Sequence, residues 1–526
     1  MTTLESAPAP VEPPSPVTPR ARVVLPVAAL SGLLCAAAFD PWNVPLAMVL
    51  GVAVLFALLR RLGSARKRLV LGSGFVYGLA FMGPLIWWMR AVSDGAYVGL
   101  VIFEALFLAV ILFALRATAR LRAWPLWTAA AWVLGEWARG TFPFSGFPWG
   151  RLVHTSIDTP FAPFVRLVGM PATSFLLALL AACLVLVVTA SWRTRLTAAA
   201  VVAVTTLVGL VLPTGVAQAQ GERVFAVVQG DVPGEFLTWK RGEIFQLHAQ
   251  ETARLASDVA AGRVQQPDVV LWPENATDTD PFHDEPVRTQ IEALSASLRA
   301  PILVGGIYDG PTSKTALNAG VVWSADGPGE RYVKRKVVVF GEYVPFRNLL
   351  GPLVPILDRD IPRDMLPGDE SGALSVVPDS GRSVMLGDTI CWDIAYDGIV
   401  RQAVGDDAEV LVVQTSNASF TGTSQPEQQW KISRLRAIET GRYVLVPSTN
   451  GISGVVDADG NVVERAPLHE PATIVKKVPL AHGSTPAQHL ELPLQIALVT
   501  LGLAGWILGV RRGTVRQDHA GEDDEA

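Results

Sequence analysis

VMLGDTICWD, residues 384–393, is the stretch of this 526-residue chain that decides its fold class. Its apolar run has the pattern of a strand buried on both faces, and the Cys391 thiol follows where that strand ends in a tight turn. The other two cysteines, Cys35 and Cys183, lie within long apolar runs. Cys391 is therefore a candidate nucleophile, and the alternative is that it serves as a small buried apolar side chain.

Similar short runs rich in Val and Ile recur between residues 218 and 488, where they alternate with helical stretches. Residues 242–262 and 425–440 have apolar positions at helical spacing. This alternation predicts an α/β domain. The expected strands are RVFAVV (223–228), DVVLWP (268–273), PILVGG (301–306), AGVVW (319–323), SVMLG (383–387), EVLVV (409–413) and YVLVP (443–447).

The rest of the chain has the composition of a membrane protein. Half of all residues are hydrophobic and only 17% are charged, which is rare in soluble domains. The net charge of -5, without a segment that gathers the basic residues, argues against a nucleic-acid partner. Lys and Arg concentrate in alternate loops, so the positive-inside rule predicts cytoplasmic termini. We expect eight helical spans, at about 23–39, 44–59, 68–89, 97–115, 125–138, 165–190, 196–214 and 492–510.

These features divide the chain into five regions. We expect a disordered cytoplasmic leader at 1–20, because it is rich in Pro and Ala, and transmembrane helices 1–7 at 21–217. The α/β domain at 218–488 follows on the outer face of the membrane. The last transmembrane helix, at 489–512, returns the chain to the cytoplasm, where an acidic tail at 513–526 ends it.

Two more chemical side chains follow predicted strands. Glu274 in WPEN (272–275) comes directly after DVVLW, and Lys334 in YVKRK (332–336) follows the strand-like GERYV. Because open α/β sheets bind ligands beyond the carboxyl ends of their strands, one sheet can bring both residues to Cys391. A base beside a thiol and a cation for the oxyanion are what a thioester-forming enzyme needs. Taken singly, Glu274 can equally be a solvated loop charge, and Lys334 can equally be part of a surface basic run.

Several motifs together resemble those of the apolipoprotein N-acyltransferases, the membrane-bound branch of the nitrilase superfamily. WPEN, YxKxxxxxFGEYVPF (332–346) and a cysteine after an apolar strand are typical of the superfamily. The resemblance covers about residues 23–510. The narrower family is indicated by FDPW (39–42), GEWARG (135–140), GFPWG (146–150), VQGDVP (228–233), SRLRAIETGR (433–442) and STNG (448–451).

The resemblance implies an αββα sandwich with a Glu–Lys–Cys triad. Glu274 is then the general base, Lys334 stabilises the tetrahedral intermediate, and Cys391 is the nucleophile. Glu342, in FGEY, matches a further essential glutamate that orients the lysine or the thiol, and the alternative is a loop carboxylate paired with a basic neighbour. Trp239 and Trp392 are expected beside the substrate.

Three stretches depart from the family pattern. Asp393 stands where a glutamate is usual, Val339 stands where a proline is usual, and SNASFTG (416–422) replaces an SNDxWFG pattern. The roles of Asp393 and of the 416–422 loop therefore stay open. We expect divergence rather than loss of activity, because the three chemical residues are intact.

The implied reaction is a two-step, ping-pong acyl transfer. Cys391 attacks an ester of a phospholipid, and a lysophospholipid leaves behind an acyl thioester. The N-terminal amine of a diacylglyceryl-cysteine apolipoprotein then takes the acyl chain, which is the last step of lipoprotein maturation. No metal or other cofactor is implied. The implied location is the bacterial inner (cytoplasmic) membrane, with the catalytic domain on its periplasmic face.

Because both substrates are lipids, the site is expected to open at the bilayer. NLLGPLVPIL (348–357) is too short to span a membrane. We interpret it as an arm that carries Leu349, Leu350 and Leu353 into the outer interface, and ordinary core packing is the alternative.

Two charges in the apolar part of the chain, Glu136 and Arg139, are costly to bury in a membrane. They lie three residues apart on one expected helix, which predicts that they pair with each other. Four tryptophans are expected in an aromatic belt at the interface: Trp42, Trp87, Trp88 and Trp149.

Two other functions fit parts of the sequence. An anchored amidase of the nitrilase type would use the same triad with water as the final acceptor, but one span would suffice for it. A transporter or receptor would use the outer domain only to bind ligands and has no need of an aligned Glu, Lys and Cys. Eight spans around a thiol-bearing domain favour the acyltransferase.

Overall fold

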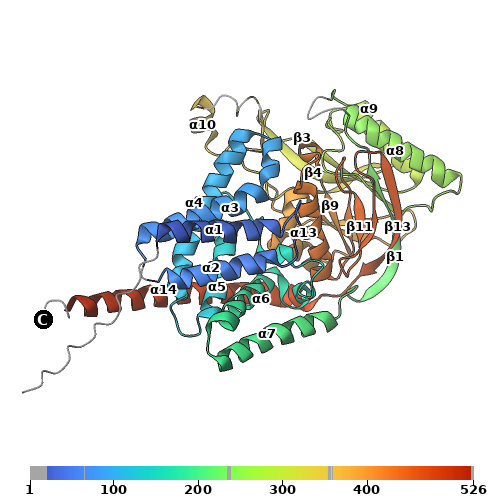
Figure 1. The fold of residues 1–526 in the computed structure, drawn as a ribbon. Helices are drawn as coiled ribbons and strands as arrows, with labels where there is room; N and C mark the ends of the chain where they lie inside the picture. The colour runs from blue at the N-terminus through green and yellow to red at the C-terminus, as the bar shows by residue number, and fades with distance from the viewer. Residues whose placement is uncertain are drawn as a thin grey trace, which may run out of the picture.

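The computed structural model describes residues 20–63, 65–233, 239–353, 357, 359 and 361–522. Within these ranges, the side chains of residues 350, 353 and 513–522 are also left out of the description. The expected leader, apart from Arg20, and the last four residues of the expected tail lie outside the described residues. Figure 1 shows a bundle of helices on one side of the molecule and two β-sheets on the other.

Every apolar segment expected to span a membrane is a helix. Those long and apolar enough to cross are α3, α4, α6, α7 and residues Pro486–Arg512 of α14, whereas α1, α2 and α5 have 17, 15 and 16 residues. Helix α14 continues past residue 512, where we expect the span to end. The helices are α1 (Ala21–Ala37), α2 (Ala47–Arg61), α3 (Lys67–Leu85), α4 (Asp94–Thr118), α5 (Trp124–Arg139), α6 (Phe164–Thr189), α7 (Trp192–Val211) and α14 (Pro486–Glu522).

The second part is a sandwich of two sheets, and all seven expected strands are present in it. The first sheet has the order β13-β1-β2-β3-β4-β5, with β6 paired to β4, and the second has the order β12-β11-β10-β9-β8-β7. The strands are β1 (Ala219–Gln229), β2 (Val269–Leu271), β3 (Ile302–Asp309), β4 (Thr315–Ser324), β5 (Gly327–Val333), β6 (Asp364–Met365), β7 (Ala373–Val376), β8 (Val384–Ile390), β9 (Val410–Gln414), β10 (Val444–Val446), β11 (Gly454–Val456), β12 (Val462–Arg465) and β13 (Ala472–Ala481).

Helices cover both outer faces of the sandwich, which gives four layers. Helices α8 (Glu243–Ala260) and α9 (Glu285–Leu298) lie on the far side from the bundle (Figure 1). Helix α13 (Gln425–Thr440) lies between the second sheet and the bundle (Figure 1). Helix α12 (Asp397–Gly405) contacts β8 of the second sheet and α14 of the bundle. The inner faces of the sheets meet in a core of aliphatic side chains, which the β-branched composition of the strands provides.

Helix α13 joins the sandwich to the bundle through polar contacts. Gln428 Oε1 accepts hydrogen bonds from Trp149 Nε1 at 2.7 Å and from Trp88 Nε1 at 3.1 Å. These two tryptophans are buried at this junction, so their expected place in an aromatic belt is wrong. A polar acceptor on α13 draws both indole N–H groups inward, whereas Trp42 and Trp87 remain more than half exposed.

The predicted pairing of Glu136 with Arg139 is also wrong. Arg139 forms an ion pair with Glu104 of α4 at 3.4 Å and donates to Trp149 O at 2.6 Å. Glu136 accepts from Leu152 N at 2.7 Å. The loop after α5 folds back over the helix end, and its backbone groups satisfy these charges better than the neighbour on the same helix.

Ion pairs also cross from the bundle to the sandwich. Arg151, in the loop after α5, pairs with Asp397 of α12 at 2.8 Å, and Arg436 of α13 binds the same carboxylate at 2.8 Å. Arg401 of α12 pairs with Glu491 of α14 at 2.9 Å. Burial alone raises the pKa of the Asp397 carboxyl, but the two guanidinium groups outweigh it and hold this pKa well below its ordinary value.

Candidate active site

Glu274 lies in the turn after β2, and its buried carboxylate is fully engaged. Oε1 accepts from Lys334 Nζ at 3.1 Å and from Asn318 Nδ2 at 2.8 Å. Oε2 accepts from the backbone N–H of Ser416 at 2.9 Å. Because Ser416 follows β9 of the second sheet, this last bond crosses the sandwich. The carboxylate is a fixed group with defined donors and not a solvated loop charge.

Lys334 directly follows β5, and its side chain is 2% exposed. It donates to Glu342 Oε1 at 2.8 Å in addition to Glu274. Burial alone lowers the pKa of this lysine, but the charges of Glu274 and Glu342 outweigh it and hold the pKa well above its ordinary value. Two carboxylates therefore fix one permanent cation, and the alternative of a surface basic run does not apply to Lys334.

Glu342 holds both its partner lysine and its own loop in place. Its Oε2 accepts from Val338 N at 2.7 Å, while Oε1 accepts from Lys334 and, at 3.0 Å, from Asn318 Nδ2. Asn318 thus bridges the two glutamates. Sequence reasoning missed Asn318, although a single amide inside the apolar strand TALNAGVVW is a signal that could have found it, since buried polar side chains need partners.

Cys391 begins the short 3-10 helix η3 (Cys391–Ala395) directly after β8. Its φ of 51° places the nucleophile candidate in the left-handed region, which a non-glycine residue adopts only under local constraint. Glu274 and Lys334 follow strands of the first sheet, whereas Cys391 follows a strand of the second. Our expectation of one shared sheet is therefore wrong: the carboxyl ends of strands in two facing sheets bring the three residues together.

The surroundings of Cys391 keep its thiol protonated. Burial, and then the negative charge of Glu274, raise the pKa of the Cys391 thiol to about 12. The charge of Lys334 and a side-chain hydrogen bond with Thr415 act in the opposite direction. Attack by sulfur then requires that a neighbouring base remove the proton, and Glu274 is the carboxylate whose charge acts most strongly on the thiol.

Asp393, whose role the sequence left open, ties η3 to the lysine loop. It is fully buried, and its Oδ1 accepts from Lys336 N at 2.9 Å. Its Oδ2 accepts from the Tyr332 hydroxyl at 2.7 Å. The aspartate therefore binds groups on both sides of Lys334 while standing two residues from Cys391, and it links the two segments that carry them. Sequence reasoning missed Tyr332 as its partner.

The divergent 416–422 loop also contributes to the site. Its first backbone N–H binds Glu274, as described above, and contacts with other segments hold the rest of the loop in place. Asn417 donates to Gln425 Oε1 at 3.0 Å and accepts from the Ser448 hydroxyl at 2.9 Å. Phe420 packs edge-on against Trp88 of the bundle, with ring centroids 5.2 Å apart. An aromatic contact with the bundle is thus present although the family's tryptophan is not.

Two tryptophans, Trp392 and Trp239, are also expected beside the substrate. Trp392 stacks on Trp149, with centroids 5.0 Å apart and planes 2° apart, so its ring packs against the bundle. Trp239 is half-buried directly after residues 234–238, which lie outside the described residues, and its place beside the substrate stays a prediction.

The expected arm contains helix α10 (Arg347–Leu353), which lies apart from the two sheets, above the bundle helices in the view of Figure 1. Leu349 is 65% exposed and Phe346 is 69% exposed. Phe346 contacts Phe144 of the loop after α5, with ring centroids 5.9 Å apart. The side chains of Leu350 and Leu353 lie outside the described residues. For Leu349, core packing is excluded.

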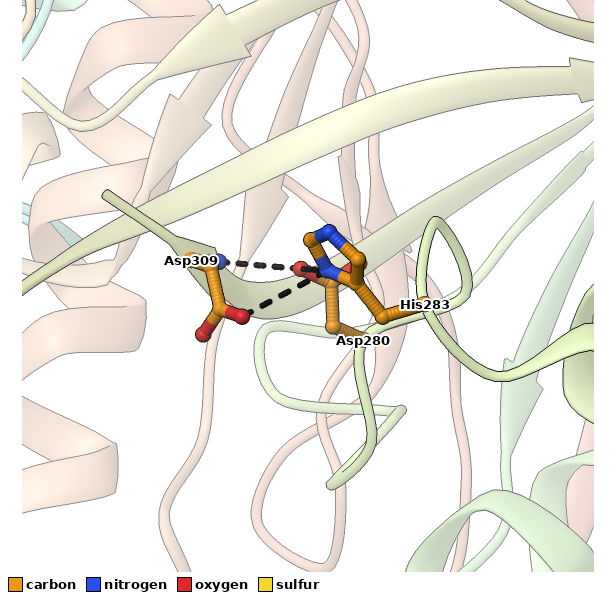
Figure 2. A group of neighbouring side chains, drawn as sticks. All are labelled: Asp280, His283 and Asp309. Carbon is orange, nitrogen blue, oxygen red and sulfur yellow. Dashed lines mark hydrogen bonds and ion pairs between the residues drawn. The ribbon is translucent and has the colours of Figure 1, made fainter. Parts of the chain in front are cut away.

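A separate group of side chains, Asp280, His283 and Asp309, meets near the end of β3 (Figure 2). Each offers an atom that suits a metal ion, and these atoms lie within 4.8 Å of one another. Protein groups already occupy the carboxylates, however. Asp280 accepts from Asp309 N at 2.9 Å, and Arg363 pairs with Asp309 at 2.6 Å. The arrangement is accounted for as a hydrogen-bonded loop.

Two family models match this chain. Residues 31–183 match the apolipoprotein N-acyltransferase N-terminal domain, and residues 225–485 match the carbon-nitrogen hydrolase family. The second match places the α/β sandwich in the nitrilase-like fold.

Curated relatives match along most of the chain. The apolipoprotein N-acyltransferase of Mycolicibacterium smegmatis is 35% identical over 84% of this chain and 77% of its own length. The corresponding proteins of Coxiella burnetii and Photobacterium profundum are 28% and 26% identical, and each match covers 88% of this chain. It covers 95% and 90% of their own lengths. Among solved structures, an amidase from Nesterenkonia sp. is similar over 53% of this chain and 98% of its own, with a TM-score of 0.35 and 14% identity.

Proposed function

This chain belongs to the apolipoprotein N-acyltransferase family, and on that premise we propose that Cys391 carries an acyl group between two lipid substrates. A phospholipid donates the fatty acyl chain, and the N-terminal amine of a diacylglyceryl-cysteine apolipoprotein accepts it. The observation that carries this proposal is the fixed Glu274–Lys334 ion pair, whose charges act on the thiol that follows β8.

In the first step, the Cys391 sulfur attacks an ester carbonyl of the phospholipid while Glu274 takes the thiol proton. The two glutamates face one ammonium, so the cluster carries an excess negative charge that this proton neutralises. Lys334 stabilises the oxyanion, a contribution worth roughly 10²–10³-fold in rate when a single donor is removed. The C–O bond then breaks, the lysophospholipid oxygen takes the proton from Glu274, and an acyl thioester remains.

In the second step, the apolipoprotein amine attacks the thioester carbonyl. Glu274 accepts a proton from the amine as the new C–N bond forms, the C–S bond breaks to release the Cys391 thiolate, and Glu274 returns the proton to that sulfur. The products are the amide and the free enzyme. A water molecule in place of the amine would waste the acyl chain, so the site has to exclude water.

The proposal extends to the arrangement in the membrane. We take all eight helices as spans, with both termini in the cytoplasm and residues 218–488 on the outer face. The exposed side chain of Leu349 in the arm, and that of Phe346 two residues before the arm, support its place at the outer interface, because large apolar side chains are stable there in contact with lipid.

Intact mass spectrometry of the full-length protein in phosphatidylethanolamine micelles tests the proposed function. We expect a hydroxylamine-labile acyl adduct on the wild type, none on Cys391→Ala, and an unchanged adduct on the matched variant Cys183→Ala. A diacylated lipopeptide added afterwards should accept the acyl chain, and the adduct on the enzyme should disappear. Release of free fatty acid instead would assign a hydrolase, and a wild type without an adduct would refute the thioester.

A further inference from the structure

A cavity of about 460 Å³ lies between the bundle and the catalytic domain, beside the candidate active site. Trp137 and Ser145 line it from α5 and the loop that follows, Gln495 lines it from α14, and Tyr396 and Gln402 line it from the catalytic domain. Neither part of the protein forms this cavity alone. It lies where α5 ends and α14 begins, which is the expected level of the outer bilayer interface.

Two cations that line the cavity, Arg335 and Lys336, have no carboxylate side-chain partner among the described residues. The Arg335 guanidinium donates to the neutral amide oxygen of Gln402 at 2.6 Å. The Lys336 ammonium lies 5.1 Å from the centroid of the Tyr396 ring. Asp393 lies close to both residues, but it accepts from the backbone N–H groups of Lys336, at 2.9 Å, and of Arg335, at 3.5 Å, and not from either side chain.

The other charges of the cavity wall neutralise one another. The two carboxylates in the lining, Glu136 and Asp397, both pair with Arg151, at 3.7 and 2.8 Å. Arg401 pairs with Glu491 at 2.9 Å. The wall therefore presents excess positive charge, and that charge comes from the two residues that directly follow Lys334.

The cavity is also close to the reacting atoms. Helix η3 begins with Cys391, and its last residue, Ala395, lines the cavity. Five residues of 3-10 helix rise by only about 8–10 Å. A ligand with a charged group in the cavity can therefore reach the thiol with a neighbouring part of the same molecule.

We propose that Arg335 and Lys336 bind the phosphate of the phospholipid acyl donor while Cys391 attacks its ester. Arg and Lys are the side chains that bind phosphate in proteins, and a partly buried site strengthens their attraction. The inference rests on the proposed function and deepens it. It makes the phosphate a recognised part of the donor, and glycerol connects the phosphate to the ester by only a few bonds.

The test compares two donors in the full-length protein. Arg335→Gln/Lys336→Gln should raise the KM for phosphatidylethanolamine about 10-fold in acyl-adduct formation, with kcat changed by no more than about twofold. With a diacylglycerol of the same chains, which lacks the phosphate, the variant and the wild type should differ by no more than about twofold. An equal rise in KM for both donors, or no rise for either, overturns the proposal.

Matched variants separate charge from structure. Lys336→Arg keeps the charge and should restore a near wild-type KM in the presence of Arg335, whereas Lys336→Gln should not. Lys314→Gln removes an exposed lysine elsewhere in the same domain and should leave the KM unchanged. If Lys314→Gln raises the KM as much as Lys336→Gln does, the effect is one of net charge, and the proposal fails.

A binding measurement distinguishes this inference from the acyl-transfer mechanism. In a Cys391→Ala background, native mass spectrometry counts bound phosphatidylethanolamine without any chemistry. Adding Arg335→Gln/Lys336→Gln should remove most of that bound lipid, and equal retention refutes the proposal even if no acyl transfer is ever seen. Inorganic phosphate is the second probe: should it protect the wild type but not the variant against heat, with lipid retention unchanged, the cavity binds free phosphate and the inference is overturned.

Discussion

The Tyr332 hydroxyl donates to Asp393 Oδ2 at 2.7 Å, although the tyrosine lies on β5 of the first sheet and the aspartate follows β8 of the second. The bond joins the strand that ends before Lys334 to the turn that begins with Cys391. Both residues are buried, so the contact is protected from water. The two residues are about 60 positions apart in sequence, and this hydrogen bond connects them directly.

We predict that Asp393→Ala slows acyl-adduct formation by about 10–100-fold and destabilises the fold by roughly 1–3 kcal/mol, because buried donors lose their acceptor. Asp393→Glu, which restores the acid usual in the family, should recover most of the rate. A merely structural role would lower the melting temperature without changing the rate per folded molecule. Adduct formation measured on the folded fraction separates the two cases.

Alkylation of Cys391 should depend steeply on pH. Since the pKa of this thiol is raised to about 12, the thiolate fraction rises about tenfold per pH unit across the range near neutrality. Iodoacetamide labelling should therefore increase without a plateau up to about pH 9, whereas acyl-adduct formation, in which Glu274 takes the proton, should change far less. A labelling plateau near neutral pH would contradict the raised pKa.

Removal of the Lys334 charge should affect both rate and stability. Lys334→Met leaves Glu274 and Glu342 close together without their common cation, which should cost on the order of 3–5 kcal/mol of folding free energy. The acylation rate should fall by about 10²-fold or more. Glu342→Gln, which leaves one carboxylate for the lysine, should be closer to the wild type in stability. Thermal unfolding and adduct formation measure the two effects, and a fully stable, active Lys334→Met variant would disprove this account of the cluster.

Asp388 should make stability fall as pH rises. Among the described residues, neither of its buried carboxyl oxygens has a hydrogen-bond partner of good geometry, and the same holds for the amide oxygen of Gln414. Burial raises the pKa of Asp388 well above its ordinary value, and the charge of Asp393 raises it further. Above about pH 4 the unfolded chain loses this proton while the folded protein keeps it, which favours unfolding by up to about 1.4 kcal/mol per pH unit.

Asp388→Asn removes that titration. The variant should therefore gain stability relative to the wild type between about pH 5 and pH 8, and its own stability should depend less on pH. Denaturant unfolding at both pH values measures the difference. If the stability of the wild type relative to Asp388→Asn instead increases with pH, Asp388 is ionised in the folded state.

The exposed arm should matter for loading of the lipid and not for folding. Phe346→Ser/Leu349→Ser should slow acyl-adduct formation from bilayer phospholipid by about 5–10-fold while the melting temperature stays unchanged, because exposed positions contribute little to stability. Leu468→Ser, at an exposed site elsewhere in the catalytic domain, is the control. Equal rates for the arm variant and the wild type would rule out the arm.

The strand ends that carry Glu274, Lys334 and Cys391 could be predicted from sequence, because the pattern of each strand is local to its own segment. That these ends belong to two facing sheets could not be predicted in this way. Contacts between distant segments could not. The bond from Trp149 to Gln428 and the pair of Arg139 with Glu104 join positions whose local patterns are independent. Each of those side chains has several possible partners, and only the packing of the bundle against the sandwich selects one.

The roles of Asp393 and Asn318 show the same limit at the site itself. The partners of Asp393 could not be predicted from its sequence position, because Tyr332 and the backbone of Lys336 come close to it only in the folded sandwich. Asn318 was detectable as an odd polar residue in a strand, but its two glutamate partners were not.

Helix α13 has no exposed residue, although it is rich in Gln, Arg and Glu. One side rests on the second sheet and the other on the bundle, where Lys431 pairs with Asp40 at 2.6 Å and Arg434 pairs with Asp158 at 2.6 Å. A fragment made of residues 218–488 alone would turn that side to solvent and strand Trp392 without its stacking partner. We therefore expect such a fragment to lose stability, because the bundle supplies buried partners for α13 and Trp392 and does more than anchor the sandwich to the membrane.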